Sequence, residues 1–143
     1  YKGMKVTLRR NEVGNGERQL GVRLAMNGKD EDEYLYRVEQ SKTLAGKVHA
    51  SPFSRNDAEI IYRERWTPSV GYCLPITQFN SKQCKEIQSP FMNAILPKMG
   101  FNRHFPRAVV TGPTCYQGKG LDEYEVKQYK SSGKVCGLSR NGR

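Results

Sequence analysis

The segment at residues 101–107 interleaves aromatic and cationic side chains, in the order Phe-Asn-Arg-His-Phe-Pro-Arg. An arginine can contact phosphate oxygens through its planar fork, and an exposed aromatic ring can stack on a base or sugar. Lysines on the preceding predicted helix can extend the same surface. The pattern predicts a nucleic-acid-binding surface that consists of Lys82, Lys85, Lys98, Phe101, Arg103 and Arg107. A second interpretation stays open, in which Phe101 and Phe105 pack the loop onto a core and the arginines are only solvated.

Carboxylates that could hold a catalytic metal are scarce. Polymerases and nucleases bind two divalent metals through converging acidic side chains. The only aspartates are Asp30, Asp32, Asp57 and Asp122, and none lies in a predicted strand. The acidic run at residues 30–33 is consecutive rather than convergent, and it suits the positive N-terminal end of a helix dipole. We therefore predict no catalytic residue, no metal site and no cofactor in this chain.

The glycine-rich run at residues 112–120 reads Gly-Pro-Thr-Cys-Tyr-Gln-Gly-Lys-Gly. A phosphate-binding loop requires four residues between its first glycine and its Gly-Lys pair, followed by Ser or Thr. Here five residues intervene, and Gly120 follows Lys119. The run therefore predicts a tight turn before the last helix rather than a phosphate cradle.

Cysteine chemistry has little support in the spacing. Cys73, Cys84, Cys115 and Cys136 contain no Cys-x-x-Cys pair, which disfavours a zinc site or a redox motif. The pattern also differs from the dense spacing of a secreted disulfide framework. A pairing of Cys73 or Cys84 with His104 stays open, although buried, inert cysteine is the commoner case. We expect a reduced, intracellular protein, in the cytoplasm or the nucleus.

The composition favours a polyanionic partner. The 143 residues suit one domain or part of one, and 24 Lys and Arg against 14 Asp and Glu give a net charge of +10. Such an excess most often serves nucleic-acid binding, although a merely solvated basic surface carries the same charge. No apolar run approaches the roughly 18 residues of a membrane span. We predict a nucleic-acid partner, no membrane and no small-molecule cofactor. The first residue is Tyr1 rather than Met, and we expect a fragment of a longer protein.

Alternating apolar and polar residues at the N-terminal side predict an antiparallel hairpin. Residues 4–10 and 18–26 show this alternation, and a turn centred on Gly14-Asn15-Gly16 separates them. The second strand is the clearer one, because its alternate residues would share one buried face: Leu20, Val22, Leu24 and Met26. The hairpin should be half buried.

Periodicity and capping signals predict helical segments at residues 30–50, 54–66, 67–74 and 80–99. Ser54 opens a variant capping box, Pro68 suits a first helical turn and Asn80 can cap the fourth segment. Pro90 should kink or split that last segment, and Gly100 should end it. The expected inward-facing residues are Leu35, Val38, Leu44, Val48, Ile60, Ile61, Tyr62, Trp66, Tyr72, Ile87, Phe91, Ile95 and Met99.

The remaining residues complete an α+β fold. Residues 108–111 predict a short strand or extended run, and residues 121–129 a short amphipathic helix. The polar, glycine-rich end should be loose. We therefore expect an N-terminal antiparallel hairpin (residues 1–28), a mostly helical, bundle-like region (29–130) with a short extended run and a last helix, and a loose tail (131–143).

The run from Trp66 to Leu121 carries a specific order of short motifs. It opens with Trp-x-Pro-Ser-x-x-Tyr-x-Leu-x-x-Thr, continues through Lys-Met-Gly-Phe-Asn-Arg, Pro-Arg-Ala-Val-Val and Gly-Pro, and closes with Gly-Lys-Gly-Leu. This order resembles the region downstream of the polymerase core in retrotransposon reverse transcriptases. The resemblance covers roughly residues 18–129, with Leu20-Gly21-Val22 similar to the strand that closes the palm. Residues 117–121 depart slightly from the family pattern, Gly-Gly-x-Gly-Leu, and the match fades after Tyr129.

The resemblance implies one part of a larger machine, with the palm's last hairpin and a thumb- and connection-like helical region. The parent would be an RNA-directed DNA polymerase that uses a divalent metal such as Mg²⁺, with its catalytic acids upstream of Tyr1. This part would help grip the template–primer duplex, RNA–DNA or DNA, mainly through backbone contacts, beside the upstream palm and fingers. Two alternatives stay open: a structural connector between the polymerase core and downstream domains, and an independent enzyme that uses Cys and His.

Overall fold

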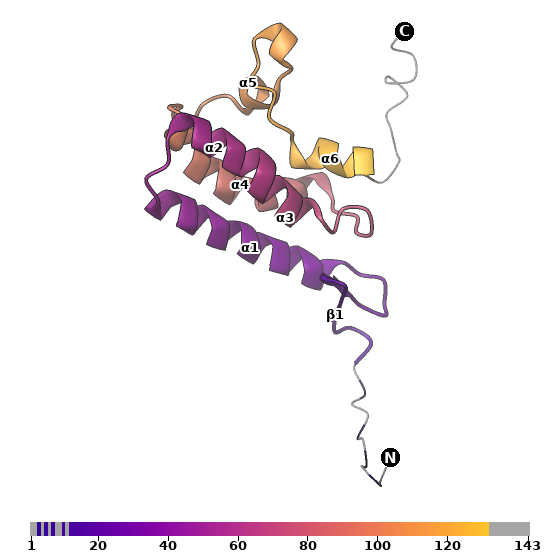
Figure 1. Ribbon diagram of the computed structural model, residues 1–143. Coiled ribbons are helices and arrows are strands. Elements are labelled where there is room, and N and C mark those ends of the chain that lie inside the picture. The colour runs from indigo at the N-terminus through magenta and orange to yellow at the C-terminus, as the bar shows by residue number, and fades with distance from the viewer. Residues whose placement is uncertain (1–2, 4, 6, 8–9, 11, 132–143) are drawn as a thin grey trace, which may run out of the picture.

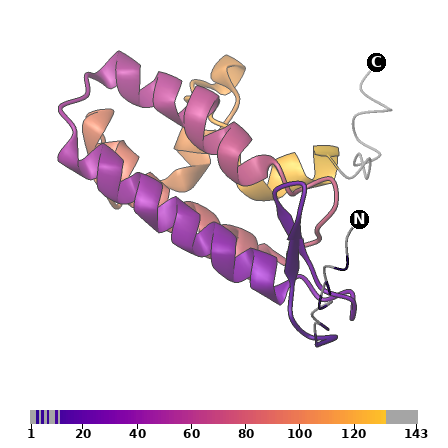
Figure 2. The same ribbon diagram turned by 60° about the horizontal axis from the view of Figure 1, so that its bottom comes forward.

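The computed structural model describes residues 3, 5, 7, 10 and 12–131. Within these residues a two-stranded antiparallel hairpin, visible in Figure 2, is followed by helices (Figure 1), which confirms the predicted α+β class. The two longest helices, α1 (Glu31–Ala50) and α4 (Ser81–Lys98), pack along each other more extensively than any other pair of elements. The predicted tail lies outside the described residues, except for its first residue, Ser131, which ends the last helix.

The hairpin is shorter than predicted and turns at another place. Strands β1 (Glu17–Gln19) and β2 (Val22–Leu24) pair antiparallel, so the alternating run at residues 18–26 is not one continuous strand. The chain reverses at Leu20 and Gly21, whose φ angles are 49° and 89°. Both values are positive, as in the type I′ turn that connects strands with matching twist.

Burial explains why the alternation was misleading. Of the four apolar residues expected on one strand face, only Val22 is buried, and Leu20 is 93% exposed at the tip of the turn. Glycine at the second turn position supplies the positive φ that a hairpin of this kind requires. The other predicted strand, residues 4–10, lies largely outside the described residues.

Helix α1 begins in the predicted acidic run, but it buries a different face from the expected one. Leu35 is 62% exposed, whereas Val48 is buried as predicted. The buried residues of α1 are mostly small or polar: Glu33, Arg37, Ser41, Ala45 and Val48. Glu33 and Arg37 can be buried because they pair, with Arg37 Nε 2.6 Å from Glu33 Oε1.

The next segment is one helical run with a wider turn in its middle. Helix α2 (Arg55–Ile61) starts at the predicted capping box, in which Ser54 and Asp57 exchange hydrogen bonds. A π-helical turn, η1 (Tyr62–Trp66), and helix α3 (Thr67–Gly71) continue it. Two of the expected inward-facing residues of this region are exposed, namely Ile60 and Tyr72.

Pro68 accounts for the π-helical turn. Proline has no N–H to donate to the carbonyl four residues earlier, and its ring clashes with that carbonyl. The chain widens here, and the Thr67 N–H donates to the Tyr62 carbonyl five residues earlier. The Thr67 hydroxyl donates to the same oxygen at 2.8 Å. The wider turn brings Tyr62 and Trp66 onto the buried side of the run.

Helix α4 follows the sequence prediction closely. Asn80 and Gln83 form a capping box at its start. The helix runs through Pro90 without being split and ends before Gly100, whose φ is +87°. Gly100 N–H then bonds the Pro97 carbonyl and the next N–H bonds the Leu96 carbonyl, which is the Schellman pattern. The predicted stripe is buried, as expected: Ile87, Phe91, Ile95 and Met99.

The predicted extended run at residues 108–111 is wrong, because this segment is helical. Helix α5 (Arg107–Thr111) starts directly after Pro106, whose carbonyl accepts the Val109 and Val110 N–H groups. The β-branched residues favour a strand only weakly, and burial of Val110 against the core overrides that preference. A 3₁₀ turn, η2 (Thr114–Tyr116), and helix α6 (Tyr124–Ser131) follow.

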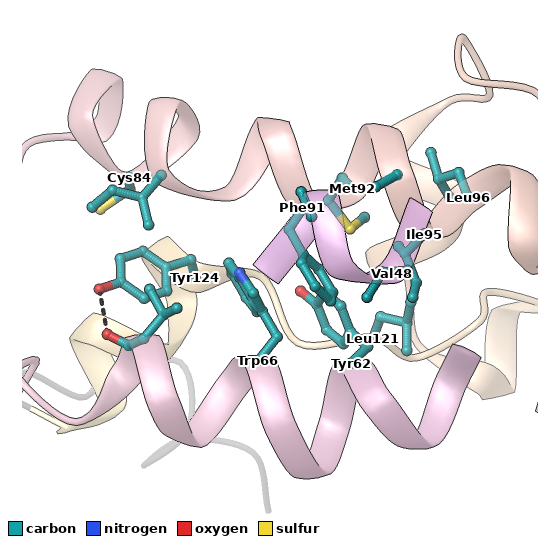
Figure 3. Packing of buried hydrophobic residues seen from close by; sticks show 14 of the residues in the cluster. Val48, Tyr62, Trp66, Cys84, Phe91, Met92, Ile95, Leu96, Leu121 and Tyr124 are labelled. Atoms are coloured by element: carbon teal, nitrogen blue, oxygen red, sulfur yellow. Dashed lines mark hydrogen bonds between the residues drawn. The ribbon is translucent and has the colours of Figure 1, made fainter. Parts of the chain in front are cut away.

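An aromatic cluster forms the centre of the core (Figure 3). The rings of Trp66, Tyr62 and Phe91 form a compact triangle, in which the Trp66 centroid lies 5.1 Å from that of Tyr62 and 5.4 Å from that of Phe91, and the latter two are 6.1 Å apart. The Trp66 indole N–H donates to Ser41 Oγ at 3.1 Å, so the buried polar atom is satisfied. The Tyr124 ring of α6 packs against Trp66 in a tilted arrangement, with an interplanar angle of 60°. These rings, together with Ser41, therefore join α1, the α2–α3 run, α4 and α6 into one unit.

Candidate nucleic-acid interface

Three adjoining hollows follow one side of α4 and the α4–α5 connection. The first is lined in part by Lys82, Lys85 and Ser89. The second, about 260 Å³ in volume, shares Lys85 and Ser89 with the first and adds Arg107. The third shares Arg107 with the second and adds Arg103. Because neighbouring hollows share lining residues, Lys82, Lys85, Arg107 and Arg103 follow one another along one surface, which we call the cationic trough.

Helix geometry positions the α4 side of the trough. Lys82, Lys85 and Ser89 are spaced by three and four residues, so they share one exposed face. The opposite face carries the buried apolar stripe. Helix α5 brings Arg107 against α4, where its Nη2 donates to Asn93 Oδ1 at 2.7 Å.

The loop between α4 and α5 places Arg103 at an exposed position. Phe101 and Phe105 stack on each other with centroids 4.7 Å apart, and both pack partly buried against the core. The Asn102 side chain accepts the backbone N–H of His104 and closes the turn between them. The phenylalanines thus anchor the loop, as the second interpretation of the sequence had it. Phe101 does not line the trough.

Arg107 is the most constrained cation of the trough. Partial burial lowers the pKa of its guanidinium from the ordinary value, since the protein removes water from the charge. Its Nη1 is covered by protein atoms and is the one buried side-chain nitrogen or oxygen without a hydrogen-bond partner among the described residues. Such a group costs roughly 1–3 kcal/mol, and more when charged, until an acceptor reaches it.

The lysines of the trough are largely free to meet a ligand. Lys82 faces Glu86 at 3.9 Å, but the lysine side chain is 86% exposed, and such pairs contribute little. Lys85 forms no ion pair within the described part of the chain. Two carboxylates oppose the cations locally, because Glu86 lines the first hollow and Glu123 the second. The trough is therefore cationic in balance rather than uniformly so.

The sixth predicted residue, Lys98, serves a different purpose. Its Nζ donates to the Ser51 carbonyl at 2.9 Å, where α1 ends. The contact satisfies a carbonyl beyond the helix end and ties α4 to the α1–α2 connection. The structure thus brings together Lys82, Lys85, Arg103 and Arg107 and leaves Lys98 and Phe101 outside.

Sequence reasoning missed two polar members of this surface, Ser89 and Asn93. Ser89 could have been found from its spacing, one helical turn after Lys85. Asn93 had no comparable signal, because its role depends on where α5 docks.

The acidic run at the start of α1 holds backbone groups instead of a metal. Each of three carboxylates accepts an N–H from a different segment: Asp32 from Gly16, Glu33 from Arg23 and Asp30 from Gln78. Across the described residues, no three His, Cys, Asp or Glu side chains converge into a group that could hold a metal ion.

The cysteines and His104 do not form a nucleophile–base pair in the structure. Cys73 and Cys84 are buried, whereas His104 is exposed in the α4–α5 loop. Burial raises the pKa of both thiols, that of Cys84 to about 11. A buried thiol with a raised pKa is a poor nucleophile.

The glycine-rich run folds into a closed turn, as predicted. Gly120 N–H donates to the Gly112 carbonyl at 2.9 Å. A Cβ at Gly118 would lie 2.1 Å from that carbonyl oxygen, so the backbone itself fills the turn.

No protein-family model, no curated protein and no solved structure matches this chain. Within the described residues, none of the helices combines the length and the apolar character needed to cross a bilayer.

Proposed function

We propose that this chain is a non-catalytic part of a retroelement reverse transcriptase that helps grip the template–primer duplex. The observation that carries the proposal is the cationic trough. Lys82, Lys85, Arg107 and Arg103 come from two helices and a loop, yet they line three hollows that adjoin one another. A row of cations on a rigid surface suits a phosphate backbone, which presents charges at regular intervals.

The grip is expected to tolerate any sequence. Contacts to phosphates position a protein on a duplex, whereas contacts to base edges read sequence. The trough offers lysine and arginine to a backbone, and its aromatic neighbours Phe101 and Phe105 are engaged with each other. In this proposal the upstream palm and fingers carry out the polymerase chemistry and bind its divalent metal. The whole protein acts inside the cell. An upstream reading frame that encodes an Asp-Asp turn between two strands would support the assignment.

A second candidate function is a structural connector that packs the polymerase core against neighbouring domains. A specific observation favours it. Several large apolar side chains are more than half exposed in and around the hairpin: Leu20, Met26, Tyr72 and Ile76. The turn glycine Gly21 lies against Tyr72, so the hairpin tip and the end of the α3 region adjoin. Exposed apolar groups of this kind suit a protein partner better than a polyanion.

Salt-dependent binding of an RNA–DNA hybrid separates the two candidates. The grip predicts that the logarithm of affinity falls with the logarithm of salt concentration with a slope of about −0.9 for each phosphate contacted. The double variant Lys85→Glu/Arg103→Glu changes two exposed cations of the trough. It should weaken binding and reduce the slope by about 2.

The matched control is Lys42→Glu/Lys47→Glu, which reverses two exposed lysines of α1 that line none of the three hollows. Circular dichroism of each variant establishes that its fold is intact. Equal binding by Lys85→Glu/Arg103→Glu and the control would remove the trough from the interface and leave the connector. Absence of any salt-sensitive binding at low ionic strength would sink the grip.

A further inference from the structure

The central hollow of the trough contains hydrogen-bond donors that the protein itself does not use. Lys85 forms no ion pair, and Ser89 Oγ has no hydrogen bond within the described residues. Arg107 uses Nη2 on Asn93 and leaves Nη1 without a partner. Lys85 and Ser89 approach from α4, whereas Arg107 approaches from α5. The three residues line one hollow of about 260 Å³, at whose Arg107 side Nη1 is covered by protein atoms.

We propose that this central hollow binds a single phosphate group, between Lys85 and Ser89 on one side and Arg107 on the other. The inference rests on the proposed function and makes it specific, because it selects one position in the trough where a phosphate is seated rather than merely attracted. A tetrahedral oxyanion presents acceptors in several directions, and arginine, lysine and hydroxyl donors match it.

The geometry of Arg107 favours an anion over a neutral ligand. Its Nη2 is fixed by Asn93, so the guanidinium is already oriented before a ligand arrives. Nη1 has no hydrogen bond to lose, so an anionic oxygen that reaches it replaces no existing partner of that nitrogen. Binding would therefore relieve an unsatisfied group, and the hydrogen bonds formed would be charge-assisted.

Glu123 makes the proposal selective and testable. Its carboxylate lines the same hollow and opposes a second negative charge. Lys85 and Arg107 together with Glu123 leave one net positive charge in the hollow, which suits a single phosphate group rather than several. Glu123→Gln should therefore tighten phosphate binding by about two- to fivefold, the size of one nearby charge at a partly exposed site.

Titration of the full chain with inorganic phosphate, against chloride at matched ionic strength, tests the seat by NMR. We expect saturable shifts centred on Lys85, Ser89 and Arg107. Lys85→Gln and Arg107→Gln should each abolish the saturable shifts, and Glu123→Gln should make them saturate at a lower phosphate concentration. Lys82→Gln, which removes the same charge three residues away and outside this hollow, should keep the saturable shifts.

Duplexes with 5′-hydroxyl and with 5′-phosphate ends identify the source of the phosphate. Equal affinity assigns the seat to an internal backbone phosphate, and tighter binding of the phosphorylated duplex assigns it to a strand end. Shifts that do not saturate, or that survive both Lys85→Gln and Arg107→Gln, would overturn the seat. If the protein binds a duplex but shows no saturable phosphate binding, only the single-phosphate site is rejected. If it binds no duplex at all, the proposed duplex-binding function is rejected.

Discussion

At the scale of single residues, a short chain of hydrogen bonds satisfies the polar atom at the centre of the aromatic cluster. Trp66 donates its indole N–H to Ser41 Oγ, and the Ser41 hydroxyl donates to the Ile87 carbonyl at 2.7 Å. The serine thus lets a tryptophan be buried where α1 and α4 meet. Its small side chain also allows the close approach of the two helices, because a larger residue would separate them.

Ser41→Ala should lower the free energy of unfolding by about 1–3 kcal/mol, since it leaves the buried indole N–H without an acceptor. Urea unfolding followed by the fluorescence of Trp66, the only tryptophan, measures the change. Thr43→Ala is the control, because this exposed hydroxyl donates only to a carbonyl of its own helix. A loss no larger than that of the control would mean that the hydrogen bond is dispensable.

Buried thiols give the fold a dependence on alkaline pH. Burial raises the pKa of Cys84 from 9.0 to about 11, and it raises that of Cys73. A raised folded-state pKa contributes stability that is complete below pH 9.0 and is lost as the pH rises towards 11. We expect the urea midpoint to fall across this window. Cys84→Ala should show a shallower fall, and an identical slope would contradict the assignment.

The sequence predicted buried residues correctly where a helix packs an apolar face against the core. The stripe at Ile87 and Phe91 was predictable because the helical period places these residues on one face. Arg37 was not predictable as a buried residue, because its place depends on Glu33 and on backbone carbonyls of other segments. The prediction that Leu35 faces the core was wrong, because its side chain lies on a side of α1 that faces solvent.

At the scale of elements, the hairpin turn places an unsuitable residue in a demanding conformation. Leu20 has a φ of 49° and is 93% exposed, so it has strain without compensating contacts. Asparagine adopts positive φ more readily, and Asn-Gly is the preferred pair for such a turn. Leu20→Asn should therefore stabilise the hairpin by about 0.5–1 kcal/mol, measured by amide hydrogen exchange of β2. Leu20→Val should act in the opposite direction; equal effects of the two would rule out this turn geometry.

A buried ion pair, Glu33 with Arg37, is one of the contacts that attach the hairpin to the helices. Glu33 accepts the Arg23 N–H at 2.7 Å, while Arg37 donates to the carbonyls of Gly21 and Ser69. The pair therefore connects the turn, α1 and α3 through backbone groups. Fixed backbone partners explain why an ion pair occupies a place where apolar side chains would leave these carbonyls unsatisfied.

Arg37→Met should destabilise the protein by about 3–5 kcal/mol, because it leaves a buried carboxylate uncompensated. The double variant Arg37→Met/Glu33→Gln should recover part of that loss, since the remaining side chain is neutral. Chemical unfolding of Arg37→Met, Glu33→Gln and the double variant gives the coupling energy between the two residues. A double variant that is less stable than Arg37→Met would show that the carboxylate charge is not the source of the cost.

Element boundaries were predictable where a local signal defines them. Ser54, Asn80 and Gly100 cap or end helices through contacts within a few residues. The turn at Gly21 and the helical state of residues 107–111 depend on packing against distant segments. The sequence therefore predicted the helices and their caps better than the hairpin, and it predicted four members of the trough without predicting their order along it.

At the scale of the whole molecule, charge and fold oppose each other. The chain has a net charge of +10, and a compact state holds those charges closer together than an unfolded one. Within the described residues the ion pairs are few, and only that between Arg37 and Glu33 is fully buried. Screening by salt should therefore stabilise the fold, whereas the proposed binding of a duplex should weaken as salt rises.

We expect the free energy of unfolding of the free protein to rise by on the order of 1 kcal/mol between about 50 and 200 mM salt, which thermal unfolding records as a higher midpoint. The affinity for an RNA–DNA hybrid should fall over the same range. Lys82→Gln/Lys85→Gln removes two positive charges from the trough, so it should flatten both dependences. Lys42→Gln/Lys47→Gln, with the same change of charge on α1, should flatten only the dependence of stability. If the two double variants flatten the binding curve equally, the duplex responds to net charge and not to the trough.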